Sequence, residues 1–236
     1  MLVALVGKQG VGKTVLADKM STQGFKKLSF ATPMRDMFSY VFGHDKIDRG
    51  WMQSFGEASR KVKEEIWTDK MNDLMESYLP SNIVIDDVRY ESEMMNTIIP
   101  YINRVDGVVV KLDADEITRF NRRFQNASIS KNSAVAIDYA YRSMKADEYI
   151  GKSPKLLYAA GRAGLSDEEM EKVYNWTQFQ EHKSEVNLDG FEYAKHVDRF
   201  IEIKSQDPIS EEDVFNRLLN ETHLIHKDTQ RKSLLI

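Results

Sequence analysis

The sequence predicts an α/β fold of three layers, in which helices flank a mostly parallel sheet. Short apolar runs alternate with stretches of helical periodicity in the order βαβααβαβ over residues 1–112. A complete glycine-rich loop joins the first apolar run to the first helical stretch. The apolar run at 82–89 ends in two acids and a base. In such folds these features meet at the carboxyl edge of the sheet, where ligands bind.

Composition and charge indicate a globular chain of ordinary domain size. The 236 residues are 42% hydrophobic and 30% charged, as expected for a folded domain. No apolar run reaches about 18 residues and the N-terminus lacks the pattern of a signal peptide, so we expect no membrane segment and a cytoplasmic location. The absence of cysteine excludes disulfides, thiolate metal sites and cysteine nucleophiles. A net charge of −4 argues against tight non-specific DNA binding through the whole surface, although a local basic patch is compatible with it.

The first strand and the first helix enclose a phosphate-binding loop. Leu2–Val6 is short and apolar, as a buried strand should be, and a helix is expected from about Lys13 to Gln23, before Gly24. Between them, Gly7–Thr14 matches G-x-x-x-x-G-K-[ST] at every fixed position. Strand, loop and helix in this order are the context that this motif requires.

The loop predicts a nucleotide phosphate site. Glycines allow backbone N–H groups to surround the β-phosphate, Lys13 would bridge the β- and γ-phosphates, and the Thr14 hydroxyl would hold Mg²⁺. We therefore expect ATP or GTP together with Mg²⁺; the alternative is a tight turn with no ligand. The residues expected to bind the nucleotide are Gly7, Gln9, Gly10, Val11, Gly12, Lys13 and Thr14.

The remaining core elements are read from periodicity and from turn residues. Proline and glycine mark several of their ends, as at Gly43 and at Pro80-Ser81. The expected strands are 25–30, 82–89, 107–112 and 197–203, and the expected helical stretches are 32–42, 51–79, 90–102 and 208–220.

The acids at the end of the 82–89 strand are candidates for metal or acceptor binding. Asp86 and Asp87 could hold Mg²⁺ through water or orient the acceptor, and the alternative is a pair of helix-capping acids. Arg89 follows two residues later and could bind a second phosphoryl group bidentately, unless it is a surface arginine.

Residues 113–181 depart from the alternating pattern and are expected to form a helical insertion or lid. They are polar and rich in basic and aromatic residues. Arg119, Arg122 and Arg123 lie at helical spacing, so they could close on a transferring phosphoryl group or form a solvated charged face. The expected organisation is a core of 1–112 and 182–222, an insertion of 113–181 and a tail of 223–236.

Several motifs recur in a fixed order along the chain. They are the loop Gly7–Thr14, Gln53, Gly56, Trp67, Asp87, Arg89, Glu93 and the motif His182-Lys183-Ser184-Glu185. Together they resemble the phage deoxynucleoside monophosphate kinases, within the P-loop nucleoside monophosphate kinase superfamily. The resemblance covers roughly residues 1–112 and 182–220, whereas the long 113–181 insertion departs from the compact lid of that family.

The resemblance implies a P-loop kinase fold and transfer of the ATP γ-phosphoryl group to a deoxynucleoside 5′-monophosphate. The catalytic residues would be Lys13, Asp87 and Arg89, to which the spacing within the insertion adds Arg119 and Arg123. The metal residues would be Thr14 and Asp87, and the substrate-binding residues would be Arg60, Trp67, Arg89, Glu93, His182 and Glu185. Core packing is the alternative for Trp67. Related enzymes are often dimers, so a homodimer is one expectation, in the host-cell cytoplasm if the protein is encoded by a phage.

The long insertion keeps two other functions open. An enlarged basic and aromatic lid could fold over a polymeric acceptor, which would make the chain a kinase of a hydroxymethylated pyrimidine base in phage DNA. A third possibility is a switch or DNA-packaging accessory protein that only hydrolyses the nucleotide.

Overall fold

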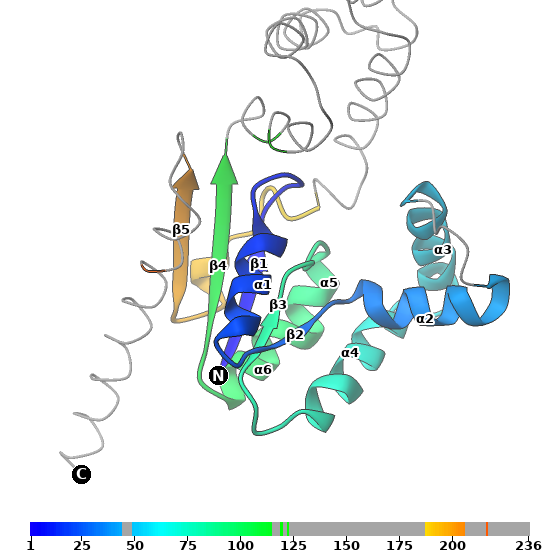
Figure 1. The fold of residues 1–236 in the computed structure, drawn as a ribbon, viewed down its shortest axis with the longest axis horizontal. Helices are drawn as coiled ribbons and strands as arrows, with labels where there is room; N and C mark the ends of the chain where they lie inside the picture. Colours follow the sequence, from blue (N-terminus) through cyan, green and yellow to red (C-terminus); the bar gives the residue numbers. More distant parts are fainter. Residues whose placement is uncertain (44–48, 115–118, 120–121, 123–186, 206–215, 217–236) are drawn as a thin grey trace, which may run out of the picture. The chain divides into compact units, whose positions relative to one another are not determined.

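The computed structural model describes residues 1–43, 49–114, 119, 122, 187–205 and 216, and Figure 1 shows the fold. The strands are β1 (Leu2–Val6), β2 (Lys26–Leu28), β3 (Ile83–Ile85), β4 (Gly107–Ala114) and β5 (Phe200–Ser205). The helices are α1 (Lys13–Thr22), α2 (Ala31–Phe42), α3 (Arg49–Val62), α4 (Ile66–Ser77), α5 (Glu91–Glu93), a π-helical turn (Met94–Ile98), α6 (Ile99–Arg104) and a 3₁₀ turn (Tyr193–Lys195).

The chain divides into two compact units. The first comprises residues 1–7, 12–113 and 187–236, and the second comprises residues 8–11 and 114–186. The expected final helix at 208–220, apart from residue 216, and nearly all of the expected insertion and tail lie outside the described residues. Within the described part, no helix is long and apolar enough to cross a membrane.

The sheet has five strands in the order β2-β3-β1-β4-β5. Strand β1 lies at its centre and is parallel to both β3 and β4, with Leu2 opposite Ile83 on one side and Gly107 on the other. Strand β2 is parallel to β3, and the arrowheads of β4 and β5 lie at the same end in Figure 1. The predicted α/β fold with a mostly parallel sheet is confirmed.

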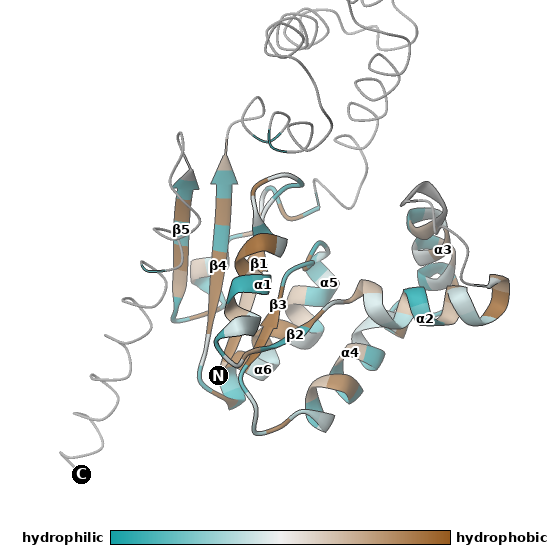
Figure 2. Cartoon of the chain, in the orientation of Figure 1, coloured by the Kyte–Doolittle hydropathy of each residue, from teal (hydrophilic) through white to brown (hydrophobic). Residues whose placement is uncertain are grey.

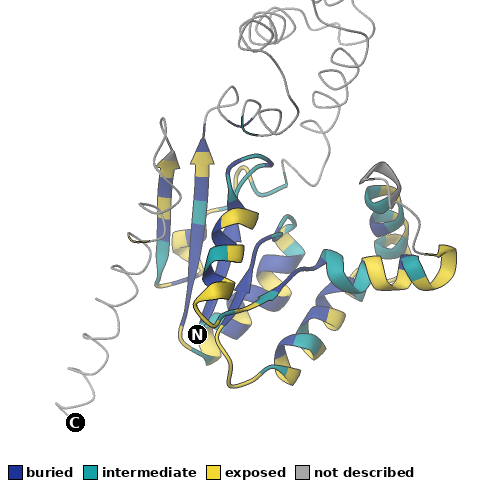
Figure 3. Cartoon of the chain, viewed as in Figure 1, coloured by how far each residue is buried: buried dark blue, intermediate teal, exposed yellow. Residues whose placement is uncertain are grey.

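The core is built on the central strands. All five residues of β1 and all three of β3 are buried. Both strands are largely brown, or hydrophobic, in Figure 2 and dark blue, or buried, in Figure 3. A strand that is covered on both faces needs apolar residues at every position, which is why both runs are continuous and not alternating. On α4, Trp67, Met71 and Met75 recur every four residues and are fully buried, as one face of an amphipathic helix.

Two helical stretches differ in detail from the prediction. The single stretch expected at 51–79 is two helices, because the chain turns between α3 and α4, where Ile66 N–H donates to the Lys63 carbonyl at 3.2 Å. The helix expected at 90–102 is present over 91–104, and it contains the five-residue π-helical turn directly after Glu93.

Strand ends also differ from the prediction. Strand β3 ends at Ile85, so the two acids and Arg89 belong to the loop that follows it. The last strand is Phe200–Ser205 and begins three residues later than the expected 197–203.

Candidate functional site

The glycine loop adopts backbone conformations that side chains disfavour. The φ angles of Gly7, Gly10 and Gly12 are 132°, 86° and 101°, in the left-handed range that glycine enters without strain. Gly12 is the N-cap of α1, with no side-chain cap. The amides at the start of this ten-residue helix therefore depend on a partner other than a capping side chain, which is the arrangement that binds anions.

Lys13 and Thr14 form the first turn of α1. Lys13 is 6% exposed, and its ammonium donates a hydrogen bond to the Gly7 carbonyl. A cation at a helix N-terminus is disfavoured by the helix dipole, and burial of the ammonium adds a desolvation cost. The position therefore favours an anionic ligand beside the ammonium. The Thr14 side chain is exposed on the same turn.

Within the second unit, two arginines bind the backbone of the loop. Arg119 donates to the Gln9 carbonyl and Arg122 to the Val11 carbonyl, each at 3.3 Å. Arg119 is 5% exposed, and its carbonyl would lie 2.6 Å from a β-carbon placed on Gly10. Glycine at position 10 is therefore required by this close approach as well as by its φ angle.

Asp86 follows β3 and belongs to a charged network with β2 and α1. The carboxylate is 7% exposed, and Lys27 Nζ lies 3.3 Å from it. The same ammonium lies 2.7 Å from Asp18 of α1. Lys27 therefore offsets the charge of the buried Asp86 carboxylate.

Asp87 has a different set of partners, all near the start of α2. Its carboxylate accepts hydrogen bonds from Ser29 Oγ at 2.5 Å, Phe30 N at 2.8 Å and Ala31 N at 2.9 Å. Burial raises the pKa of Asp87, and the charge of Asp86 adds to that effect, while the three hydrogen bonds oppose it.

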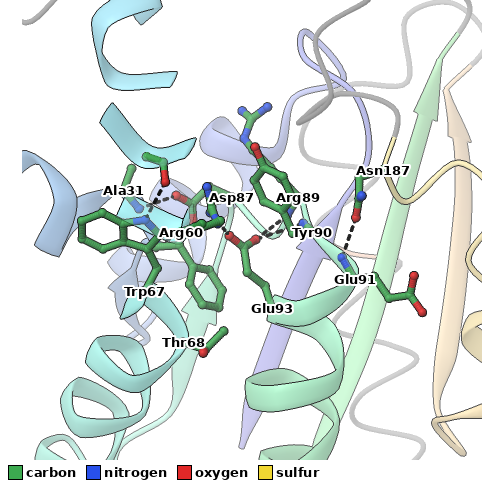
Figure 4. Close-up of polar contacts among 12 residues, drawn as sticks. Ala31, Arg60, Trp67, Thr68, Asp87, Arg89, Tyr90, Glu91, Glu93 and Asn187 are labelled. Carbon is green, nitrogen blue, oxygen red and sulfur yellow. Dashed lines mark hydrogen bonds and ion pairs between the residues drawn. The ribbon is translucent and has the colours of Figure 1, made fainter. Parts of the chain in front are cut away.

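Glu93 is the centre of a cluster that joins α3 to the loop after β3 (Figure 4). Its Oε1 accepts from Arg60 Nη2 at 2.9 Å, and its Oε2 accepts from the backbone N of Arg89 at 2.8 Å and of Tyr90 at 3.1 Å. The side chain is almost fully buried. Desolvation is the main reason why its pKa is raised from 4.5 to about 7, and the nearby Asp87 charge contributes in the same direction.

Arg60 is held on two sides. Besides its ion pair with Glu93, its guanidinium carbon lies 3.9 Å from the centroid of the Tyr90 ring, a cation–π contact. The arginine side chain is 17% exposed, so part of it still faces solvent. Arg89 is half-buried in the same loop as Tyr90. Glu93 thus binds the side chain of Arg60 and the backbone of Arg89 at the carboxyl edge of β3.

Trp67 lies in the hydrophobic core and not at the surface. It is 2% exposed, its Nε1 donates to the Gly56 carbonyl at 3.2 Å, and its ring lies 6.0 Å from that of Phe55. This hydrogen bond joins Gly56 and Trp67, two of the residues that carry the resemblance. This burial favours core packing, the alternative given for Trp67.

Some residues of the site were not identified from the sequence. Ser29 binds Asp87, Tyr90 stacks on Arg60, and Asn187 Oδ1 accepts from the Glu91 backbone N at 2.7 Å. Their partners are between 30 and 96 residues away along the chain. No local periodicity or motif could have indicated contacts over such separations.

Other predicted residues are not described by the structure. Arg123, His182 and Glu185 lie outside the described residues, so their roles stay predictions. Among the residues that are described, no group of three or more His, Asp or Glu side chains could hold a metal ion by itself. The metal roles of Thr14 and Asp87 stay predictions.

Comparison with known proteins gives a likeness of fold at low sequence identity. No family model matches the chain, and no curated protein matches it. Similar solved structures include a protein from Chloroflexus aurantiacus provisionally described as a kinase, with 11% identity over 94% of this chain and 95% of that chain, at a TM-score of 0.45.

Two further structures are similar over nearly the whole chain. The deoxyadenosine kinase of M. mycoides shares 17% identity over 94% of this chain and 99% of that chain, at a TM-score of 0.38. Dephospho-CoA kinase from Campylobacter jejuni shares 13% identity over 97% of this chain and 98% of that chain, at a TM-score of 0.40. At such low similarity, the function proposed below rests on the geometry of the site.

Proposed function

We propose that this chain is an ATP-dependent kinase that transfers the γ-phosphoryl group to a deoxynucleoside 5′-monophosphate. One observation carries the proposal. The glycine loop follows β1, and the segment with Arg89 and Glu93, to which Arg60 of α3 is bound, follows β3, the strand paired with β1 in parallel. Adjacent parallel strands end at the same edge of a sheet. A donor phosphate site and an acceptor phosphate site at neighbouring strand ends are what phosphoryl transfer between nucleotides requires.

On the donor side, the first turn of α1 would bind the ATP phosphates. The Lys13 ammonium would exchange its hydrogen bond with Gly7 for the β- and γ-phosphate oxygens, since a charged acceptor binds an ammonium more strongly than a carbonyl does. The exposed Thr14 hydroxyl fits a ligand of Mg²⁺, an ion that would neutralise charge on the phosphates.

On the acceptor side, Arg60 and Arg89 would bind the monophosphate. Guanidinium groups match phosphate oxygens bidentately, and Glu93 fixes both the Arg60 side chain and the Arg89 backbone. The resemblance to deoxynucleoside monophosphate kinases, which includes Asp87-x-Arg89 and Glu93, supports the choice of a nucleotide as acceptor.

The chemistry would need no side-chain nucleophile. An oxygen of the acceptor monophosphate would attack the γ-phosphorus, and the bond between that phosphorus and the β,γ-bridging oxygen would break as ADP leaves. The protein would supply positioning and positive charge. Further positive charge from Arg119 and Arg123 remains a prediction.

The product of labelled ATP tests the proposal. The full chain is incubated with γ-labelled ATP, Mg²⁺ and each of the four deoxynucleoside monophosphates, and with 5-hydroxymethyl-dUMP. In parallel reactions the acceptor is plain DNA or DNA that contains hydroxymethylated pyrimidines. We expect the label in a free deoxynucleoside diphosphate. Label in the modified DNA would favour the base kinase, and free phosphate alone would favour the hydrolysing switch.

A further inference from the structure

The Asp87 carboxylate, together with Ser29 Oγ, which accepts from Ala31 N at 3.2 Å, supplies the N-terminal cap that the side chain of the N-cap residue of α2 cannot give. The N-cap residue of α2 is Phe30, which offers no side-chain acceptor. Asp87 Oδ1 instead accepts from Phe30 N, and its Oδ2 accepts from Ala31 N and Ser29 Oγ, across 56 to 58 residues of sequence. Both carboxylate oxygens are therefore used by this one helix end.

The start of α2 is satisfied by this arrangement. Thr32 N donates to the Ser29 carbonyl at 2.9 Å, and Pro33 has no N–H to satisfy. With Asp87 bound to the amides of Phe30 and Ala31, none of these early donors needs a further partner. A negative charge is also favoured at a helix N-terminus, so the protein itself provides the anion at this end of α2.

Helix α2 packs on α3 and so connects Asp87 to Arg60. The Phe38 and Phe55 rings meet edge to face at 5.9 Å, and a β-carbon at Gly56 would lie 2.8 Å from Met34 Sδ. Arg60 follows Gly56 by about one helical turn. We call residues 31–42 and 49–62 the α2–α3 arm.

The arm is attached to one short segment at two points. Asp87 holds its beginning through the α2 amides, and Glu93 holds its end through Arg60. Six residues separate the two carboxylates in sequence. A change at Asp87 should therefore alter the position of Arg60, although the two side chains have no contact with each other among those observed.

We propose that Asp87 is a positioning residue that fixes the α2–α3 arm, and not a ligand of Mg²⁺. Loss of its negative charge would leave the α2 amides without an ionic acceptor and release the arm. The kinetic part of this inference rests on the proposed kinase function, since it assigns Arg60 to the acceptor. The structural part does not depend on that function.

Amide hydrogen exchange of the free protein tests the structural part. In Asp87→Asn, which keeps the size of the side chain and removes its charge, we expect exchange at Phe30 and Ala31 to accelerate by about tenfold, the scale of a lost helix cap. Ser29→Ala should shift the same amides in the same direction by less. The matched control is Glu76→Gln, an exposed acid paired with Arg104, which should leave them unchanged. Unchanged exchange at these amides in Asp87→Asn would overturn the inference. If Asp87→Asn does not fold, Ser29→Ala is judged at Phe30 alone, because Ser29 Oγ also accepts directly from Ala31 N, and unchanged exchange at Phe30 would then overturn it.

Kinetics test the alternative role of Asp87. We expect the acceptor KM to rise about tenfold in Asp87→Asn, while the half-saturating Mg²⁺ concentration changes by less than about twofold. A tenfold rise in the half-saturating Mg²⁺ concentration, with normal exchange at α2, would indicate that Asp87 is a metal ligand and would refute the positioning role. If the wild-type chain transfers no phosphate to any nucleotide, the proposed function fails, and the exchange experiment still decides the role of Asp87.

Discussion

Arg60 and Glu93 form an ion pair at 2.9 Å although 33 residues separate them in sequence. Arg60 belongs to α3 and Glu93 to α5, so the pair connects the α2–α3 arm to the loop after β3. Glu93 is buried, and it has backbone donors as well as the arginine. Breaking such a pair on one side leaves a buried charge without compensation, which costs more than an exposed pair contributes.

Glu93 should make stability depend on pH. Its pKa is raised from 4.5 to about 7 in the folded protein, mainly by burial. Between these values the native state keeps a proton that the unfolded state releases, so the free energy of unfolding falls as the pH rises. Across the interval the effect is about 3 kcal/mol.

Urea unfolding at a series of pH values measures this effect. The Glu93→Gln variant cannot titrate at this position, so subtraction of its unfolding free energy isolates Glu93 from other acids such as Asp87. We expect the difference, wild type minus variant, to be largest below pH 4.5 and to fall until about pH 7. A difference that stays constant over that interval would show that the carboxylate has an ordinary pKa.

Replacement of Lys13 should remove phosphoryl transfer without unfolding the chain. In Lys13→Ala we expect kcat to fall by about 100- to 1,000-fold, the scale of one lost electrostatic contact to the transferring group. Circular dichroism and the Tm should change little, because the lysine is a source of unfavourable burial. Lys19→Ala in the last turn of α1 is the control and should retain activity. Near-normal turnover in Lys13→Ala would contradict the proposed function.

Replacement of Arg89 should affect the acceptor more than ATP. We expect Arg89→Ala to lower kcat/KM for the deoxynucleoside monophosphate by about 10- to 100-fold, as for a lost charge-assisted contact. The KM for ATP should remain near its wild-type value. The control is Arg104→Ala, at an exposed arginine that pairs with Glu76. An equal loss of kcat/KM for both substrates would show that Arg89 does not act specifically on the acceptor.

Replacement of Trp67 should lower stability and leave the acceptor KM nearly unchanged. In Trp67→Phe the core loses volume and the Gly56 carbonyl loses its donor, so we expect a loss of about 2 kcal/mol in urea unfolding. Tyr40→Leu is the control, since Tyr40 is 92% exposed and a surface change costs within about 0.5 kcal/mol. An unchanged stability with a raised acceptor KM would instead place the indole ring in the substrate pocket.

The elements that sequence could predict are those specified by neighbouring residues. Strand β1 and the start of α1 are where the apolar run and the glycine loop place them, and β4 begins at Gly107 as expected. Their signals are local: a continuous apolar run for a buried strand, and a glycine motif for the turn. Periodicity alone could not show the turn at 63–65 between α3 and α4, because the apolar residues Val62 and Ile66 lie at helical spacing across it.

The site was predicted less completely because its contacts are non-local. The sequence identifies Asp87, Arg89 and Glu93 as a group, yet it gives no indication that Asp87 faces the start of α2 or that Glu93 faces Arg60. Both contacts depend on how helices pack on the sheet. The N-cap residue of α2 is Phe30, whose side chain cannot cap, so this position gives no signal of a helix start.

Gly56 has a consequence for heat inactivation. A glycine within a helix costs about 1 kcal/mol relative to alanine, so α3 is weak by itself and depends on its contacts with α2 and α4. Once those contacts loosen, α3 should lose its helical conformation together with the position of Arg60. On gentle warming, we therefore expect the protein to stop binding the acceptor while the loop between β1 and α1 still binds ATP. The temperature of inactivation should then lie below the Tm of global unfolding.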